Sequence, residues 1–149
     1  MTRIDFYLLS SSDAVATVCR LCEKAVGAGK RIYVLATDGA LAEQLDGALW
    51  SFRQNSFIAH ERFHGEAITE PQPPILIGDL EAPPSHHDIL VNLGAQIPDW
   101  FSSFERVLEV VDSDENRRSK SRERFRFYRE RGYPLKTYAQ TEAGGWQQK

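Results

Sequence analysis

The chain of 149 residues has little cysteine and no long apolar stretch. Its two cysteines, Cys19 and Cys22, are too few for a disulfide scaffold, so we expect reduced thiols. No run of about 18 apolar residues could cross a membrane, and the first residues lack the basic stretch and cleavage site of a secretory signal. We therefore expect a cytoplasmic protein. With 42% hydrophobic and 26% charged residues, the composition is that of one α/β domain.

Basic residues are scarce over most of the chain and concentrated in one short segment. Residues 1–116 hold 8 basic and 18 acidic residues, whereas residues 117–136 hold 9 basic and 2 acidic ones. The formal charges are therefore −10 and +7. Such asymmetry indicates an anionic partner for the basic segment rather than a particular fold.

Strands alternate with helices along the chain. Apolar runs predict strands at 4–9, 31–36, 56–60, 75–78, 88–93 and 106–111, and three- or four-residue spacing predicts helices at 14–26, 38–52 and 113–131. The polar segment 61–74, with three prolines, is typical of an irregular connection. The fold we predict is an α/β, Rossmann-like, three-layer domain with a mostly parallel sheet over residues 1–140, followed by a flexible C-terminal tail at 141–149.

Several apparent motifs do not fit the chemistry that they suggest. The glycines of GAGKR, residues 27–31, leave a helix and enter a strand, which is the reverse of a phosphate loop. Cys19 and Cys22 lie inside a predicted helix, away from the helix start that activates a redox thiol. The four histidines, His60, His64, His86 and His87, lack partners at the spacing of a zinc site. We expect no cofactor, no metal and no catalytic residues.

The basic segment forms a helix with arginines along one side. On a helical wheel Arg118, Arg122, Arg126 and Arg129 share a stripe, with Phe125 and Tyr128 along its edge. Guanidinium groups beside aromatic rings suit an acidic peptide that carries a hydrophobic residue. They also suit single-stranded nucleic acid. Alternatively, the helix is simply solvated and its rings pack on the sheet.

A second feature is a group of large rings near the end of the second helix. Trp50, Phe52 and Phe57 could form a patch for another protein or could close the domain's own core.

Taken in order, seven segments resemble the chi subunit of bacterial DNA polymerase III. They are IDFYLL, GKRIYVLA, LDGALWSF, SFIAHE, HHDILVNLG, ERVLEVVD and RERFRFYRERGYPL, and the resemblance covers about residues 4–138. The resemblance implies a non-enzymatic accessory subunit of the clamp loader, active in DNA replication. It also implies two protein partners: the psi subunit and the acidic C-terminal tail of single-stranded DNA-binding protein (SSB). DNA is then contacted only indirectly.

The resemblance also assigns residues to each partner. The tail-binding positions correspond to Arg118, Arg122, Phe125 and Arg126, with Tyr128 and Arg129 as their neighbours on the wheel, and the psi-facing positions correspond to Trp50 and Phe57. Chi chains often carry tyrosine and lysine where this chain has Phe125 and Arg126. The alternatives are a Rossmann-like nucleotide-binding enzyme and a direct binder of single-stranded nucleic acid.

Overall fold

A computed structural model describes residues 1–52, 58–67 and 70–149. The described elements are, in chain order, β1 (Arg3–Leu8), α1 (Val15–Gly27), β2 (Ile32–Leu35), α2 (Gly39–Ser51), β3 (His60–Arg62), β4 (Ile75–Gly78), β5 (Ile89–Asn92), the 3₁₀ turn η1 (Phe101–Ser103), β6 (Arg106–Val111), α3 (Glu115–Glu130), β7 (Leu135–Gln140) and β8 (Trp146–Gln148). None of the helices in this part of the chain is long and apolar enough to cross a membrane.

The strands form one sheet in the order β3-β4-β2-β5-β6-β1-β7-β8. Every neighbouring pair is parallel except β7 and β8. The predicted α/β fold with a mostly parallel sheet is therefore confirmed. Nearly continuous apolar strands such as β2 and β4, buried along their whole length, are what a sheet covered on both faces requires.

The helices begin and end at residues suited to those positions. The Asp38 carboxylate accepts hydrogen bonds from the backbone N–H groups of Ala40 and Leu41 at the start of α2. Asp114 accepts one from the N–H of Arg117 and so caps the start of α3. After α3, Gly132 has a φ of 78°, the left-handed conformation that commonly ends a helix.

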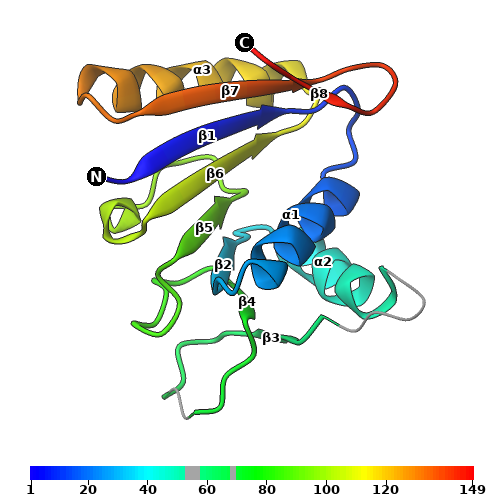
Figure 1. The fold of residues 1–149 in the computed structure, drawn as a ribbon, viewed down its shortest axis with the longest axis vertical. Coiled ribbons are helices and arrows are strands. Elements are labelled where there is room, and N and C mark those ends of the chain that lie inside the picture. Colours follow the sequence, from blue (N-terminus) through cyan, green and yellow to red (C-terminus); the bar gives the residue numbers. More distant parts are fainter. Residues whose placement is uncertain (53–57, 68–69) are drawn as a thin grey trace.

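Two apolar layers lie on opposite faces of the sheet. On one face α1 and α2 pack aliphatic residues such as Val18 and Leu45 against Val34 and Ile77. On the other face α3 and η1 contribute mainly aromatic residues, with Tyr128 among them. Figure 1 shows α3 alongside β7 and β1, whereas α1 and α2 lie together beside β2 and β4. The molecule therefore has the three predicted layers.

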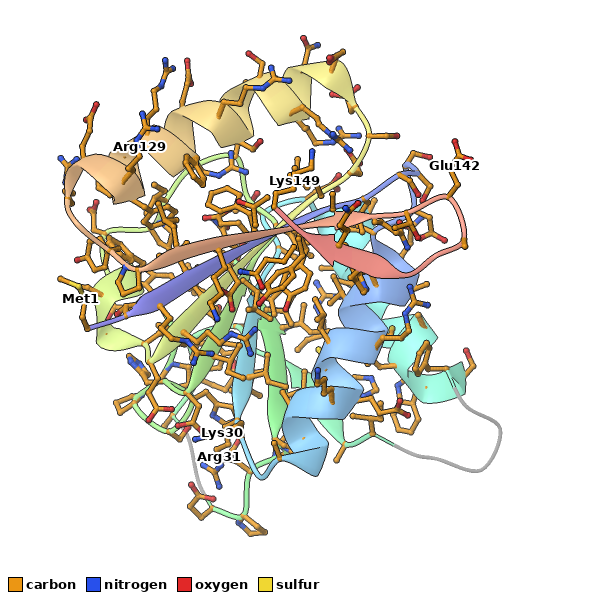
Figure 2. All side chains as sticks on the ribbon, turned by 45° about the horizontal axis from the view of Figure 1, so that its top comes forward. Met1, Lys30, Arg31, Arg129, Glu142 and Lys149 are labelled. Atoms are coloured by element: carbon orange, nitrogen blue, oxygen red, sulfur yellow. The ribbon has the colours of Figure 1, made fainter. Side chains whose placement is uncertain are left out.

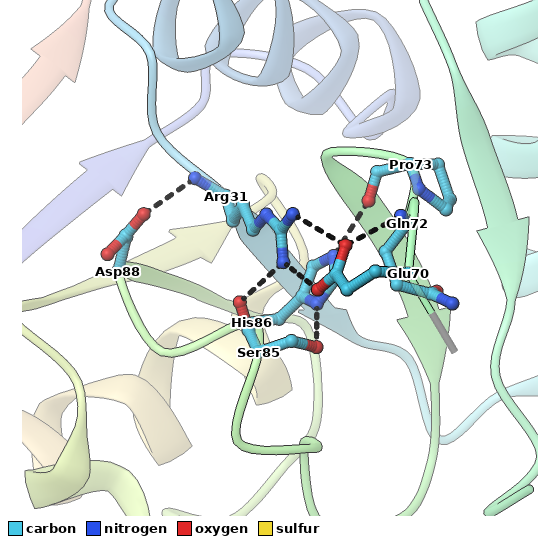
Figure 3. A network of polar contacts seen from close by, with 7 residues as sticks. All are labelled: Arg31, Glu70, Gln72, Pro73, Ser85, His86 and Asp88. Carbon is cyan, nitrogen blue, oxygen red and sulfur yellow. Dashed lines mark hydrogen bonds and ion pairs between the residues drawn. The ribbon is translucent and has the colours of Figure 1, made fainter. Parts of the chain in front are cut away.

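The polar connection before β4 is fastened to the start of β2 by hydrogen bonds (Figure 3). Two nitrogens of the Arg31 guanidinium donate to the two oxygens of Glu70, at 3.1 and 3.2 Å. His86 Nε2 donates to the carbonyl of Pro73 at 2.7 Å, and its Nδ1 accepts from the Ser85 hydroxyl. Burial lowers the pKa of His86, which suits this neutral tautomer.

The C-terminal part of the chain differs from the sequence-based expectation. The strand β7 was not predicted, and part of the expected flexible tail forms β8, which pairs with β7 as a hairpin. The strand expected at 56–60 is largely wrong: residues 56–57 lie outside the described residues, Ile58 and Ala59 are not in a strand, and β3 shares only His60 with it and continues to Arg62, within the segment expected to be irregular. Because the residues of β7 are partly buried or exposed and several of them are polar, it lacks the apolar run by which the other strands were recognised.

Candidate functional site

The inner side of α3 is held to the sheet by a buried polar cluster. Glu109, in the middle of β6, is fully buried, and its Oε1 accepts from Nε of Arg124 at 3.0 Å. Its Oε2 accepts from the Tyr128 hydroxyl at 2.7 Å and from Nδ2 of Asn92 at 3.0 Å. Arg124 also donates to the carbonyl of Ala95 at 3.1 Å. A buried carboxylate needs such partners, and here they fix the rotation of α3 about its axis.

The outer side of α3 presents three exposed arginines, Arg122, Arg126 and Arg129. Among the described residues none of the three forms an ion pair. Arg129, labelled in Figure 2, lies near the C-terminal end of the helix. Because Arg124 is turned inward, the other three guanidinium groups are left facing solvent and free to pair with an anion.

Phe125 lies between the two sides of the helix. Its ring packs edge-on against Phe6, at 5.4 Å between centroids, and the Arg129 guanidinium lies 5.9 Å from its centroid. A hollow of about 370 Å³ beside the ring is lined by Ser119, Arg122, Glu123, Phe125 and Arg126. The predicted combination of a half-buried ring with flanking guanidinium groups is therefore present on this surface.

Arg118 and Arg117 are engaged at the start of the helix. The Arg118 guanidinium donates to the carbonyl of Leu9 and, at 3.2 Å, to that of Asp112. Arg117 pairs with the Asp112 carboxylate at 2.8 Å. Although partial burial opposes it, the hydrogen bond from Arg117 lowers the pKa of Asp112. Arg118 therefore anchors α3 at one end of the predicted stripe.

The placement of Tyr128 corrects the sequence-based interpretation. Its side chain is 0% exposed, packs against Phe6 and Phe101, and donates its hydroxyl to Glu109. Burial and the neighbouring Glu109 charge raise the pKa of the phenol. Tyr128 is part of the core and is unavailable to a ligand on the outer side of the helix. For this residue the alternative of a ring packed on the sheet is the correct one.

The predicted psi-facing pair is only partly within the described residues. Trp50, near the end of α2, is 59% exposed, and its indole lies edge-on to the His60 ring at 5.2 Å. Phe57 lies outside the described residues. Phe52 is half-buried and packs against the core under α1 and α2, which is the second of the two alternatives that the sequence left open for it.

The glycines at 27–31 and the two cysteines have structural roles in the fold. Gly27 ends α1, and Gly29, with a φ of 77°, leads into β2, so these glycines end a helix as predicted. Both cysteines are free and buried, and burial raises the pKa of Cys19 to about 11, so its thiolate is scarce at neutral pH. The described residues contain no group of three or more histidine, cysteine, aspartate or glutamate side chains that could hold a metal ion.

The carboxyl ends of the parallel strands, where such folds bind nucleotides, carry a hollow of about 370 Å³. Its charged lining residues are Asp79 and Glu81, both acidic, so it would repel a phosphate. The fold and the site therefore define an α/β protein with an exposed cationic helix that has an aromatic edge.

Comparison with known proteins assigns the family. The family model described as DNA polymerase III chi subunit, HolC, matches residues 1–136, and the chain belongs to this family. DNA polymerase III subunit chi of Pseudomonas aeruginosa is 41% identical over 141 residues, which cover 93% of this chain and 96% of the relative. The chi subunit of Escherichia coli is 28% identical over 144 residues, covering 92% and 97%, and that of Haemophilus influenzae is 28% identical over 135 residues, covering 89% and 93%. The resemblance recognised in the sequence is thus confirmed. The chain is a chi subunit of DNA polymerase III, the replication polymerase.

Proposed function

We propose that this chi-family protein is a non-catalytic tether in the clamp-loader complex. One surface, around Trp50 and Phe57, holds the psi subunit. The other surface holds the acidic C-terminal tail of SSB. It is formed by Arg122, Phe125, Arg126 and Arg129, with the anchored Arg118 at its N-terminal end, and is called here the outer face of α3. The observation that carries the second assignment is that Arg122 and Arg126 line the hollow beside Phe125 and Arg129 lies over the Phe125 ring, while none of these three arginines has an ion-pair partner among the described residues.

The outer face of α3 matches the chemistry of an acidic tail that ends in a hydrophobic residue. Carboxylates pair with forked guanidinium groups, which offer two parallel N–H donors each. The hollow beside the Phe125 ring is a place for the hydrophobic side chain. Because the remainder of the chain is acidic, the attraction is confined to this helix, which suits a short peptide better than an extended nucleic-acid strand.

A contact of this size is expected to be weak by itself. Solvated ion pairs are screened by salt, so we expect a micromolar Kd, or about −8 kcal/mol, that weakens as ionic strength rises. Several tails on one coated DNA strand, together with a linked clamp loader, would raise the effective concentration without any new contact.

The tail assignment is tested by fluorescence anisotropy with a labelled acidic peptide that ends in phenylalanine. Arg122→Ala should weaken binding about ten-fold, since one charge-assisted contact is worth about 1.4 kcal/mol or more. The matched control is Lys120→Ala, an exposed cation on the same helix that lines a different hollow, and it should bind like the wild type. Equal binding by Arg122→Ala and the wild type would contradict the assignment. A labelled poly-dT strand is titrated in parallel. Tight binding of poly-dT without binding of the peptide would favour a nucleic-acid binder.

The psi assignment is tested separately by co-purification with the psi subunit. Large exposed aromatic residues are typical anchors of protein interfaces, and truncating one costs about 2 kcal/mol or more at a hot spot. Trp50→Ala should therefore reduce psi binding at least about thirty-fold. Leu80, which is 49% exposed in the loop after β4, supplies the control variant Leu80→Ala with no expected effect. Retention of psi by Trp50→Ala would place the psi contact elsewhere.

A further inference from the structure

A groove separates α1 from the strands β1, β6 and β7. It consists of two adjoining hollows of about 720 and 390 Å³. Both are lined by Tyr7, Leu21, Lys24 and Arg106, so they form one continuous feature. Figure 2 shows α1 beside the sheet, with Lys30 just beyond its C-terminal end. The groove is on the face of the sheet opposite α3 and is thus separate from the outer face of α3.

The alternation of β1 explains which side chains reach the groove. Ile4 and Phe6 pack in the layer under α3, so Arg3, Asp5 and Tyr7 point to the other face. The floor and one wall are aliphatic, with Leu108 on β6 and Leu21 and Ala25 on α1. One end is aromatic: the Tyr7 ring stacks on Tyr138 at 5.1 Å and meets Trp146 edge-on at 5.3 Å.

The groove is cationic although the body of the protein is acidic. Five of the eight basic residues in 1–116 line it, namely Arg3, Arg20, Lys24, Lys30 and Arg106. Of the 18 acidic residues in the same range, only Asp88 and Glu105 are among the described lining residues.

Two of these cations already have acidic neighbours. Arg106 pairs with the buried Asp5 at 2.6 Å, and Lys30 with the exposed Glu105 at 3.5 Å. In the described part of the chain Arg3, Arg20 and Lys24 have no ion-pair partner. These three exposed cations lie beside an apolar surface and are available to pair with acidic groups of another molecule.

We propose that this groove is a second docking site, for an acidic peptide segment of a partner protein that carries apolar side chains. The carboxylates would pair with Arg20, Lys24 and Arg3, and the apolar side chains would lie on Leu21 and Leu108. The wall of α1 from Thr17 to Ala28 rises about 16 Å, enough for about five residues of extended chain. Because the outer face of α3 lies on the opposite side of the sheet, the protein can hold two acidic segments at once. The two binding sites are independent, so loss of peptide binding at one does not imply loss at the other.

The lining favours a peptide over single-stranded nucleic acid. Single-stranded nucleic acid binds by stacking successive bases on free aromatic faces. Here Tyr7 and Tyr138 stack on each other, and Phe104 is 2% exposed and stacks on His87. Among the described lining residues this leaves Trp146, at one end of the groove and 38% exposed, as the accessible ring. A strand leaving the groove would also meet the acidic body of the chain.

The test uses the full chain with the outer face of α3 disabled by Arg122→Ala and Arg126→Ala. The probe is a labelled peptide that alternates aspartate or glutamate with leucine and phenylalanine, and a labelled dT10 strand is the second probe. Adding Arg20→Glu and Lys24→Glu should weaken residual peptide binding about ten-fold or more, because attraction is replaced by repulsion. Amide shifts in NMR spectra of the disabled chain should appear on α1, β1 and β7 when the peptide is added.

A matched control changes the net charge on the other face. Lys120→Glu in the disabled background should alter peptide affinity less than about two-fold, because it lies beyond the sheet from the groove. Thermal melting of each variant identifies loss of fold, and amide shifts of the unmutated groove supply a readout that needs no variant. Equal residual binding with and without the α1 substitutions, or shifts confined to α3, would overturn the proposal. So would dT10 binding that the α1 substitutions abolish while the peptide is ignored.

Discussion

Two arginines only two positions apart in α3 have opposite surroundings. Arg124 is 8% exposed and donates to Glu109 and to the carbonyl of Ala95, whereas Arg126 is exposed and lines the hollow beside Phe125. The difference shows that the total charge of a helix overstates the charge that it offers to a partner. Arg117, Arg118 and Arg124 are used within the protein, which leaves Lys120, Arg122, Arg126 and Arg129 exposed and without ion-pair partners among the described residues.

The largest expected effect comes from breaking the inner side. Arg124→Met should lower the free energy of unfolding by about 3–5 kcal/mol, because it leaves the Glu109 carboxylate buried without its cation. Urea unfolding followed by circular dichroism measures this loss. The control, Arg126→Met, should change stability by less than about 0.5 kcal/mol.

A double variant tests whether Arg124 stabilises the protein through its pairing with Glu109. If Arg124 acts by pairing with Glu109, adding Glu109→Leu to Arg124→Met should cost less than the sum of the two single changes. Similar small losses for Arg124→Met and Arg126→Met would remove the distinction between the two sides of the helix.

A smaller effect is expected at Tyr128. Tyr128→Phe removes one donor from the buried carboxylate and should cost about 1–3 kcal/mol in unfolding experiments. Binding of the acidic peptide should stay unchanged, because the hydroxyl lies in the core. A variant with normal stability but weakened peptide binding would instead return Tyr128 to the outer face of α3.

Alkaline pH gives a second readout for Tyr128. Because folding raises the pKa of this phenol, its neutral form is favoured in the native state. The contribution to stability is therefore complete below about pH 10, the ordinary tyrosine pKa, and is lost as pH rises beyond it. Unfolding measured across this range should show a shallower alkaline loss in Tyr128→Phe, and an unchanged slope would contradict the assignment.

Much of the fold follows from local patterns in the sequence. Apolar runs located β1, β2, β4, β5 and β6 to within one or two residues, since strands buried on both faces are apolar throughout. The helices predicted at 38–52 and 113–131 are likewise found as α2 and α3, where Asp38 and Asp114 cap the starts and Gly132 follows the end of α3. The strand β7 and the edge strand β8 were missed because their side chains are polar or at most partly buried.

The inner side of α3 depends on contacts between distant segments, which a helical wheel does not contain. The wheel placed Tyr128 beside the arginine stripe, but the rotation of the helix is set by Glu109, 19 residues earlier, and by Asn92 on β5. One signal was available: a lone glutamate in the apolar run VLEVV requires a buried partner. The next helix carries six arginines, so this signal predicts an inward-facing arginine on α3 without singling out Arg124.

The smallest expected effect on stability is that of Arg122→Gln. It is also the most discriminating, because the substitution should not lower stability but should lower peptide affinity. Arg122 stands four residues from both Arg118 and Arg126, and like charges at this spacing cost about 0.2–0.5 kcal/mol per pair. Since the Arg118 guanidinium is held by backbone carbonyls, the pair with Arg126 matters most. Arg122→Gln should therefore leave unfolding free energy unchanged or raise it by a few tenths of a kcal/mol, while acidic-peptide affinity falls.

In the control Lys120→Gln, loss of the attraction to Glu123 should lower stability slightly and leave binding intact. A parallel fall of stability and binding in Arg122→Gln would mean that the outer arginines hold the fold as Arg124 does, whereas opposite signs would show that they act on a partner at the expense of the helix.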